Sequence, residues 1–184
     1  MKRQRNPGQV WERNTPGFDA VVLATSFSGR DPGVRPKVYI QANTADEVIA
    51  AVQRAQRENL KISLVSGGHS WAQNHLRADG LLIDLSRLHR IEIDEAAMTA
   101  RVGPGCWSVD LDIALKKRGL FFPVAHAPDV CLGGYLLQGG FGWNGRTLGL
   151  ACESVIGIDV VLADGSLVHA NAQQHADLYW AARG

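Results

Sequence analysis

The alternation of apolar and polar positions predicts a strand, a helix and a second strand between residues 37 and 65. Lys37-Val38-Tyr39-Ile40 has the composition of a short strand. Thr44-Ala45-Asp46-Glu47 has that of a capping box, in which the Thr44 hydroxyl and the Glu47 carboxylate bond to each other's backbone N–H groups. The helix that begins there has one apolar face, formed by Val48, Val52 and Ala55. Ile62-Ser63-Leu64-Val65 then completes a β-α-β unit, which is right-handed by default.

Hairpin patterns follow this parallel unit and change the predicted architecture. The segments 91–93 and 99–102 alternate as two antiparallel arms do, and a helix is expected from Ser108, whose hydroxyl can cap it. Asp164-Gly165 predicts a turn between two further strands. Parallel units first and hairpins later indicate an α+β fold, with a small parallel β-α-β lobe and a larger, mainly antiparallel lobe.

The N-terminal fifth of the chain lacks such patterns. Residues 1–35 are rich in Arg, Asn, Pro and Gly and are expected to form an extended or loosely packed arm. Residues 36–184 are expected to form one domain, because 184 residues fit one domain with one or two lobes. The content of 46% hydrophobic and 20% charged residues is typical of a folded protein, and a net charge of +1 gives no basic field for a nucleic-acid partner.

Targeting and cysteine signals indicate the cytoplasm. The basic residues near the N-terminus precede no apolar run, and no stretch is long enough to span a membrane. The cysteines, Cys106, Cys131 and Cys152, are odd in number and lack the spacing of a zinc site, which favours a reducing compartment. No metal site and no membrane partner are therefore expected.

Two glycine-rich segments carry the candidate chemistry. Residues 66–70 follow a buried strand directly, and their adjacent glycines allow successive backbone N–H groups to face one concave side, where they bind phosphate oxygens. A tight turn that binds nothing is the alternative interpretation. Residues 140–145 match G-x-G-x-x-G, but a strand before them and a good helix after them are not expected, so the dinucleotide fold with that fingerprint is rejected.

Several motifs, in order, resemble the flavin-binding module of berberine bridge enzyme-like proteins, within the vanillyl-alcohol-oxidase-type (PCMH-type) FAD fold. The resemblance runs from about Arg35-Pro36 to the last residue. Its motifs are Ser66-Gly67-Gly68-His69-Ser70, Leu82-Ile83-Asp84-Leu85-Ser86, the stretch from Gly133-Gly134 to Gly142, Gly149-Leu150-Ala151 and the closing residues 177–184.

The resemblance implies FAD as the cofactor and a role for each glycine segment. The 66–70 loop would wrap the FAD pyrophosphate, and His69 would be bonded to the 8α-methyl group of the flavin. The second segment, from Gly133 to Gly142, would pass close to the flavin and its ribityl chain. The cofactor-binding residues implied in this way are Val65, Ser66, Gly67, Gly68, His69, Ser70, Val130, Cys131, Gly133, Gly134, Gly139, Gly140 and Gly142.

The sequence departs from the family pattern near the second segment. Members with a doubly linked flavin carry a cysteine where this chain has Ala127, so the second bond cannot form there. Cys131 stands where the family usually has glycine and is interpreted as a small buried residue. Val130 falls at the position that, in this family, gates oxygen at the reactive flavin face. The family's catalytic base has no counterpart in these 184 residues, so the catalytic residues stay unknown.

The resemblance implies an oxidase-type flavin oxidoreductase that oxidises a small alcohol, amine or sugar. A non-catalytic FAD-binding fragment is the alternative, and a globular domain whose glycine loops are only turns is a third. Because the substrate domain and the base are missing from the sequence, the isolated chain is expected to turn over little. Substrate identity and oligomeric state stay open.

Overall fold

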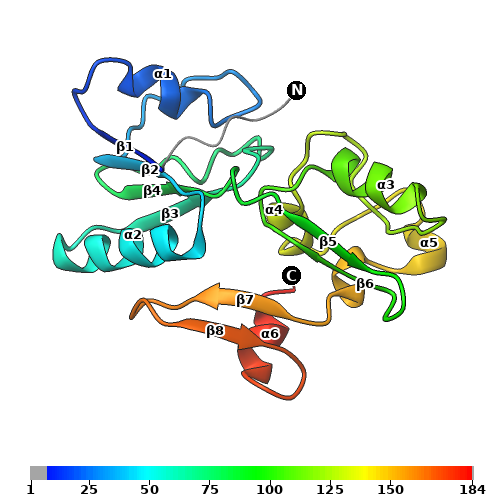
Figure 1. Cartoon of the computed structure of the whole chain (residues 1–184). Coiled ribbons are helices and arrows are strands. Elements are labelled where there is room, and N and C mark those ends of the chain that lie inside the picture. Colours follow the sequence, from blue (N-terminus) through cyan, green and yellow to red (C-terminus); the bar gives the residue numbers. More distant parts are fainter. Residues whose placement is uncertain (1–7, 184) are drawn as a thin grey trace. The chain divides into compact units, whose positions relative to one another are not determined.

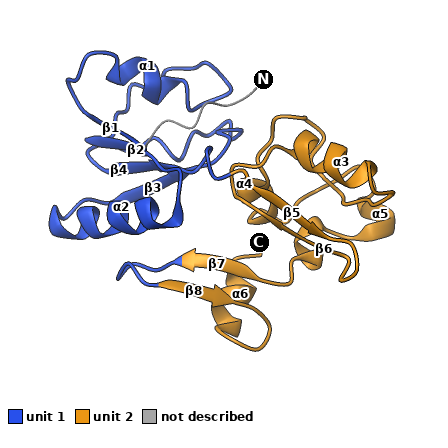
Figure 2. Ribbon diagram, viewed as in Figure 1, with its two compact units in different colours: residues 1–88, 161–166 blue, residues 89–160, 167–184 orange. Residues whose placement is uncertain are grey.

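The computed structural model describes residues 8–183, which divide into two compact units (Figure 2). Unit 1 takes in residues 8–88 and 161–166 of that part, and unit 2 takes in residues 89–160 and 167–183. Residues 1–7 and 184 lie outside the described residues. Among residues 8–183, no helix combines the length and apolar character that crossing a bilayer requires.

Unit 1 is built on a four-stranded sheet with the order β1-β2-β4-β3 (Figure 1). Its strands are β1 (Gln9–Glu12), β2 (Val38–Gln41), β3 (Ile62–Val65) and β4 (Leu81–Asp84). Both β2 and β3 pair parallel to β4, and β1 is an antiparallel edge strand beside β2. The register opposes Val65 to Asp84, so β3 and β4 end at the same edge of the sheet. The predicted β-α-β unit is confirmed, with β4 inserted between its two strands.

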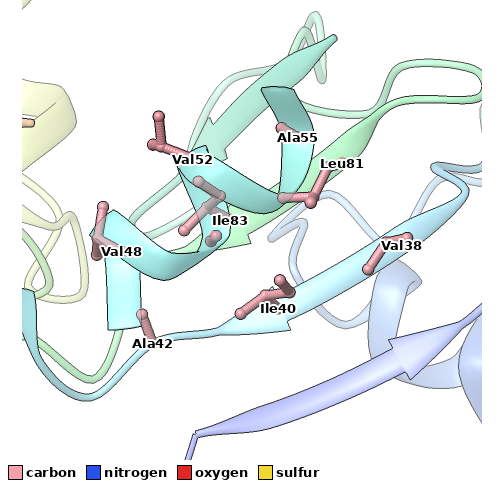
Figure 3. Packing of buried hydrophobic residues seen from close by; sticks show 9 residues of the cluster. Val38, Ile40, Ala42, Val48, Val52, Ala55, Leu81 and Ile83 are labelled. Carbon is pink, nitrogen blue, oxygen red and sulfur yellow. The ribbon is translucent and has the colours of Figure 1, made fainter. Parts of the chain in front are cut away.

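The helix α2 (Ala45–Arg57) covers one face of this sheet because its apolar side matches the face that the strands present. Figure 3 shows the side chains of α2, β2 and β4 gathered in one cluster. Its members are Val38, Ile40, Ala42, Val48, Ala51, Val52, Ala55, Leu81 and Ile83. The Thr44 hydroxyl accepts the Glu47 N–H at 3.2 Å, as predicted. The Glu47 carboxylate, however, accepts the N–H of Asn43 at 2.6 Å. The second hydrogen bond of the capping box is therefore made to the residue before the N-cap.

The opposite face of the sheet is covered by the N-terminal segment. The helix α1 (Phe18–Leu23) places Phe18 and Val22 in a second cluster with Tyr39 and Leu82, whose side chains alternate with those of the first cluster along their strands. Phe18 is 2% exposed and Val22 is 0% exposed. The prediction of a loosely packed arm is therefore wrong for residues 9–23, since β1 and α1 are part of unit 1. The division of the chain at residue 36 stays a prediction.

Unit 2 contains antiparallel pairs and short helices. β5 (Ile91–Asp94) pairs antiparallel with β6 (Thr99–Val102), and β7 (Ile158–Val161) pairs with β8 (Leu167–Ala170). The helices are α3 (Ser108–Lys116), α4 (Leu132–Leu136), α5 (Gly145–Leu148) and α6 (Ala176–Ala181), with a 3₁₀ turn η1 (Ala151–Ser154). Its core comprises Cys106, Leu111, Leu115 and Leu132. The predicted α+β fold, with parallel and antiparallel parts, is confirmed.

The start of α3 differs from the prediction. Trp107, not Ser108, is the N-cap residue, and its side chain makes no capping hydrogen bond. Ser108 is fully buried inside the first turn, where its hydroxyl accepts the N–H of Ala125 at 3.3 Å. The Ser108 hydroxyl therefore accepts a hydrogen bond from a loop later in the chain, and the local sequence pattern does not reveal this partner.

We expect Phe18→Ala to lower the free energy of unfolding by about 3–5 kcal/mol, because it removes a buried aromatic side chain between α1 and the sheet. Urea unfolding followed by circular dichroism measures the change. Phe121→Ala is the matched control, because Phe121 is 55% exposed and its loss should cost far less. Equal destabilisation by the two substitutions would contradict the packed position of α1.

Candidate functional site

The first candidate site is the loop of residues 66–70 at the carboxyl edge of the unit 1 sheet. Val65 ends β3 with its side chain 6% exposed, and residues 66–69 behind it are half buried. The backbone N–H groups of Gly67, Gly68 and Ser70 make no hydrogen bond within residues 8–183. Gly68 has a φ of +64°, which turns the chain as an anion-binding nest requires. The loop thus offers open amide donors at a position that solvent reaches.

The loop rests directly on the backbone of residues 25–27. The N–H of Phe27 donates to the Gly68 carbonyl at 3.2 Å. A Cβ atom added to Gly68 would lie 1.7 Å from the Thr25 carbonyl oxygen, a distance at which no side chain fits. Glycine at this position is therefore required by the chain itself, before any ligand is considered.

Side chains behind the loop fix the same N-terminal residues. Gln73 donates from Nε2 to the Ser26 hydroxyl at 2.7 Å. The Thr25 hydroxyl donates its single hydrogen to the Val22 carbonyl at 2.6 Å, so it accepts from His75 Nε2 at 3.0 Å. Burial lowers the pKa of the His75 imidazole, although the Asp84 carboxylate opposes this shift, and the neutral ring with hydrogen on Nε2 fits the contact. His75 thereby helps to hold Thr25 in place.

Asp84 organises the edge of the sheet beside the loop. It is 5% exposed and accepts three hydrogen bonds: from the Tyr39 hydroxyl at 2.6 Å, from Gln41 Nε2 at 3.2 Å and from the Ser86 N–H at 2.7 Å. Burial and the adjacent Asp84 carboxylate raise the pKa of Tyr39, which keeps its hydroxyl protonated as a donor. The buried carboxylate is satisfied by these donors and holds the chain ends of β2 and β4 in place.

His69 closes the loop with its ring against an aromatic side chain. The imidazole stacks on Phe27 with a centroid distance of 4.5 Å and an interplanar angle of 6°. Trp71 meets the same Phe27 ring edge-on at 4.7 Å. The local sequence pattern does not reveal Phe27, Thr25 or Gln73, because their roles arise from contacts across more than 40 residues.

The glycines of the second segment, in unit 2, have different reasons to be glycine. A Cβ on Gly133 would lie 2.7 Å from Pro104 Cβ, and one on Gly140 would lie 2.7 Å from Ala151 Cβ. Gly139 and Gly140 also have φ values of +88° and +75°. A Cβ on Gly142 would lie 3.2 Å from Pro123 Cβ. Gly134, within α4, has no atom within 4 Å of its added Cβ, so open space lies beside its backbone.

The residues before this segment form a tight turn that ends at α4. Val130 is half buried, donates its N–H to the Ala127 carbonyl at 3.4 Å and accepts the Ser108 N–H at 2.9 Å. Cys131 is 3% exposed, and its thiol lies 3.5 Å from the Gly105 carbonyl, in agreement with its interpretation as a small buried residue. Residues 140–145, which match G-x-G-x-x-G, follow the helix α4 and a turn instead of a strand. This agrees with the rejection of the dinucleotide-binding fold.

Comparison with known proteins identifies the family. The model of the FAD binding domain family matches residues 36–171. The chain belongs to this family. It is 38% identical over 176 residues to the FAD-linked oxidoreductase janO of Penicillium janthinellum, a match that covers 95% of this chain and 39% of the relative. The predicted resemblance to berberine bridge enzyme-like proteins is confirmed.

Two solved structures are similar over nearly the whole chain. A 6-hydroxy-D-nicotine oxidase from Arthrobacter nicotinovorans superposes with a TM-score of 0.88 and 33% identity, covering 96% of this chain and 38% of that one. Glucooligosaccharide oxidase from Acremonium strictum, described with a 6-S-cysteinyl, 8α-N1-histidyl FAD, gives a TM-score of 0.84 and 30% identity over 96% and 37%. The chain therefore spans about two fifths of the length of these proteins.

The residues of both segments fit an FAD binding domain. Gly67, Gly68 and Ser70 supply unpaired amide donors, which suit the negative charges of a dinucleotide diphosphate. Gly134 leaves backbone exposed where a side chain would obstruct a ligand. Among the described residues, no group of three or more His, Cys, Asp or Glu is arranged to hold a metal ion. The assignment of each residue to FAD stays a prediction, which the glycine geometry makes testable.

We expect Gly134→Ala to stabilise the chain and to weaken its binding of FAD. Alanine is favoured over glycine inside a helix by about 0.5–1 kcal/mol, and the structure has room for the new methyl group. A flavin that passes α4 closely would collide with it. Thermal unfolding without flavin and titration with FAD measure the two effects.

Gly133→Ala is the matched control, since its methyl group would strike Pro104 and destabilise the chain without any ligand. If Gly134→Ala bound FAD as tightly as the unmodified chain, the flavin would not pass this face of α4.

Proposed function

We propose that the chain is the FAD-binding portion of an oxidoreductase that oxidises a small organic molecule, such as an alcohol, an amine or a sugar. The observation that carries this proposal is the loop of residues 66–70, which bears His69 and the open amide groups of Gly67, Gly68 and Ser70. Relatives named as FAD-linked oxidoreductases, together with a carbohydrate oxidase and a xylooligosaccharide oxidase, support the reaction class. Bound FAD would accept a hydride from the substrate.

The residues of unit 1 would bind and orient the cofactor. Amides of the 66–70 loop would hold the diphosphate, and Gly68 would keep the loop against residues 25–27. His69 would bond to the 8α-carbon of the flavin, as the histidyl flavin of the Acremonium strictum oxidase suggests. Formation of this N–C bond replaces one C–H bond of the methyl group and the N–H bond of the imidazole. The two protons and two electrons released would need an acceptor, and dioxygen, reduced to hydrogen peroxide, would supply it.

Two positions in unit 2 concern the chemistry of the flavin, and the cysteines concern the compartment of the protein. Val130 would admit oxygen to the flavin, and Ala127 leaves no thiol at the place where doubly linked relatives carry one. The three cysteines are buried and form no disulfide bond among residues 8–183, which supports a reducing compartment such as the cytoplasm. The chain spans about two fifths of the length of the curated relatives that it matches, and binding of FAD without turnover is the second candidate function.

We expect FAD to become attached to the chain through His69 and through no other residue. Acid precipitation followed by a denaturing gel under ultraviolet light should show flavin fluorescence in the band of the unmodified chain and none in His69→Ala. The matched control is His126→Ala, because His126 also stacks on an aromatic ring, that of Trp143 at 3.9 Å. Flavin that stays with His69→Ala, or that leaves the unmodified chain entirely in the acid supernatant, would refute the linkage.

We expect Val130→Leu to slow the reoxidation of dithionite-reduced flavin in air-saturated buffer markedly, because a larger side chain would narrow the path of oxygen. Stopped-flow absorbance follows the return of the oxidised flavin bands. Val10→Leu makes the same chemical change at an exposed position in unit 1 and should have no effect. Equal reoxidation rates in all three proteins would remove Val130 from the oxygen path.

A further inference from the structure

Phe27 has a position that burial of apolar surface does not explain. Its side chain is 39% exposed, yet its ring lies parallel to the His69 imidazole within 6° at 4.5 Å. Its backbone N–H is bonded to the Gly68 carbonyl, and Trp71 contacts its ring edge-on. The Phe27 ring is therefore held by its own backbone and by Trp71, and one of its faces covers His69.

Such a stack restricts the rotation that matters for a nucleophilic imidazole. The lone pair of an imidazole nitrogen lies in the plane of the ring, so rotation about the Cβ–Cγ bond swings its direction. Histidine has no strong preference for one value of this torsion, so its ring can adopt a broad range of orientations. A parallel aromatic ring at van der Waals distance favours one plane over the others. The stack thus supplies an orientation that the side chain alone does not have.

We propose that Phe27 is the positioning residue of His69: its ring holds the imidazole plane in the orientation that attacks the flavin methyl group. This inference rests on the proposed function, because it needs the bond between His69 and FAD. Phe27 lies before residue 36, where the match to the FAD binding domain family begins. The N-terminal segment that sequence analysis assigned to a loose arm thereby contributes directly to the flavin site.

A positioning role and a merely structural role of Phe27 predict different effects of its substitution. Loss of loop structure would lower the total flavin bound, since the same loop carries the amide donors. Loss of the imidazole orientation would slow the covalent step and leave non-covalent binding intact. Misplacement by about 1 Å can slow a reaction on the order of a hundredfold. We expect at least a tenfold slower attachment, which corresponds to about 1.4 kcal/mol.

The experiment compares the rates of attachment in chains that are produced without flavin and then mixed with FAD in air. Total flavin is measured after desalting and covalent flavin after acid precipitation, at a series of times. Phe27→Leu removes the aromatic plane, and Phe27→Tyr retains it. Phe121→Leu is the matched control at an exposed phenylalanine of unit 2. Phe27→Leu should bind as much flavin as the unmodified chain and attach it at least tenfold more slowly, whereas Phe27→Tyr and Phe121→Leu should attach it at the normal rate.

The other outcomes separate the inference from the proposed function. Normal attachment in Phe27→Leu, or loss of total flavin in that variant while it remains folded by circular dichroism, would overturn the positioning role and leave the His69 linkage in place. Failure of the unmodified chain to attach any flavin would refute the linkage and the inference with it. If Phe27→Leu does not fold, Phe27→Met takes its place, and normal attachment in Phe27→Met would overturn the inference equally.

Discussion

The candidate site depends on one close approach of two backbone segments, in which Gly68 lies against the Thr25 carbonyl. No residue with a Cβ atom fits there, because the atom would lie 1.7 Å from the carbonyl oxygen. The approach allows the Phe27 N–H to reach the Gly68 carbonyl. It also places the Phe27 ring on His69. Amide donors and imidazole are thus oriented by a segment about 40 residues earlier in the chain.

Glycine content alone does not locate a flavin. Gly68 and Gly133 are required by contacts within the chain, and Gly139 by its backbone conformation. Only where the structure leaves space beside a glycine does the absence of a side chain point to a ligand, as at Gly134. The family match and the free amides of Gly67, Gly68 and Ser70 are the independent observations that favour FAD.

Local pattern predicts those parts of the fold that local forces determine. The Thr44 cap and the apolar face of α2, with the hairpin of β5 and β6, follow from spacing and capping chemistry. The place of β4 between β2 and β3 and the helix α1 do not, because strand order and the burial of a six-residue helix depend on distant partners. The sequence indicates the loop and His69 as a candidate site, which stays a prediction, whereas it does not indicate Phe27 and Thr25, since only the folded chain brings them to Gly68.

The central claim is that the amides of the 66–70 loop bind the diphosphate of FAD, and backbone NMR tests it most directly. A ¹⁵N-labelled chain is titrated with ADP, and with adenosine as the ligand that lacks phosphate. The account predicts that the amide resonances of Gly67, Gly68 and Ser70 shift with ADP and stay in place with adenosine. If ADP shifted resonances elsewhere in the chain and left these three unchanged, the loop would be a turn and not a phosphate site.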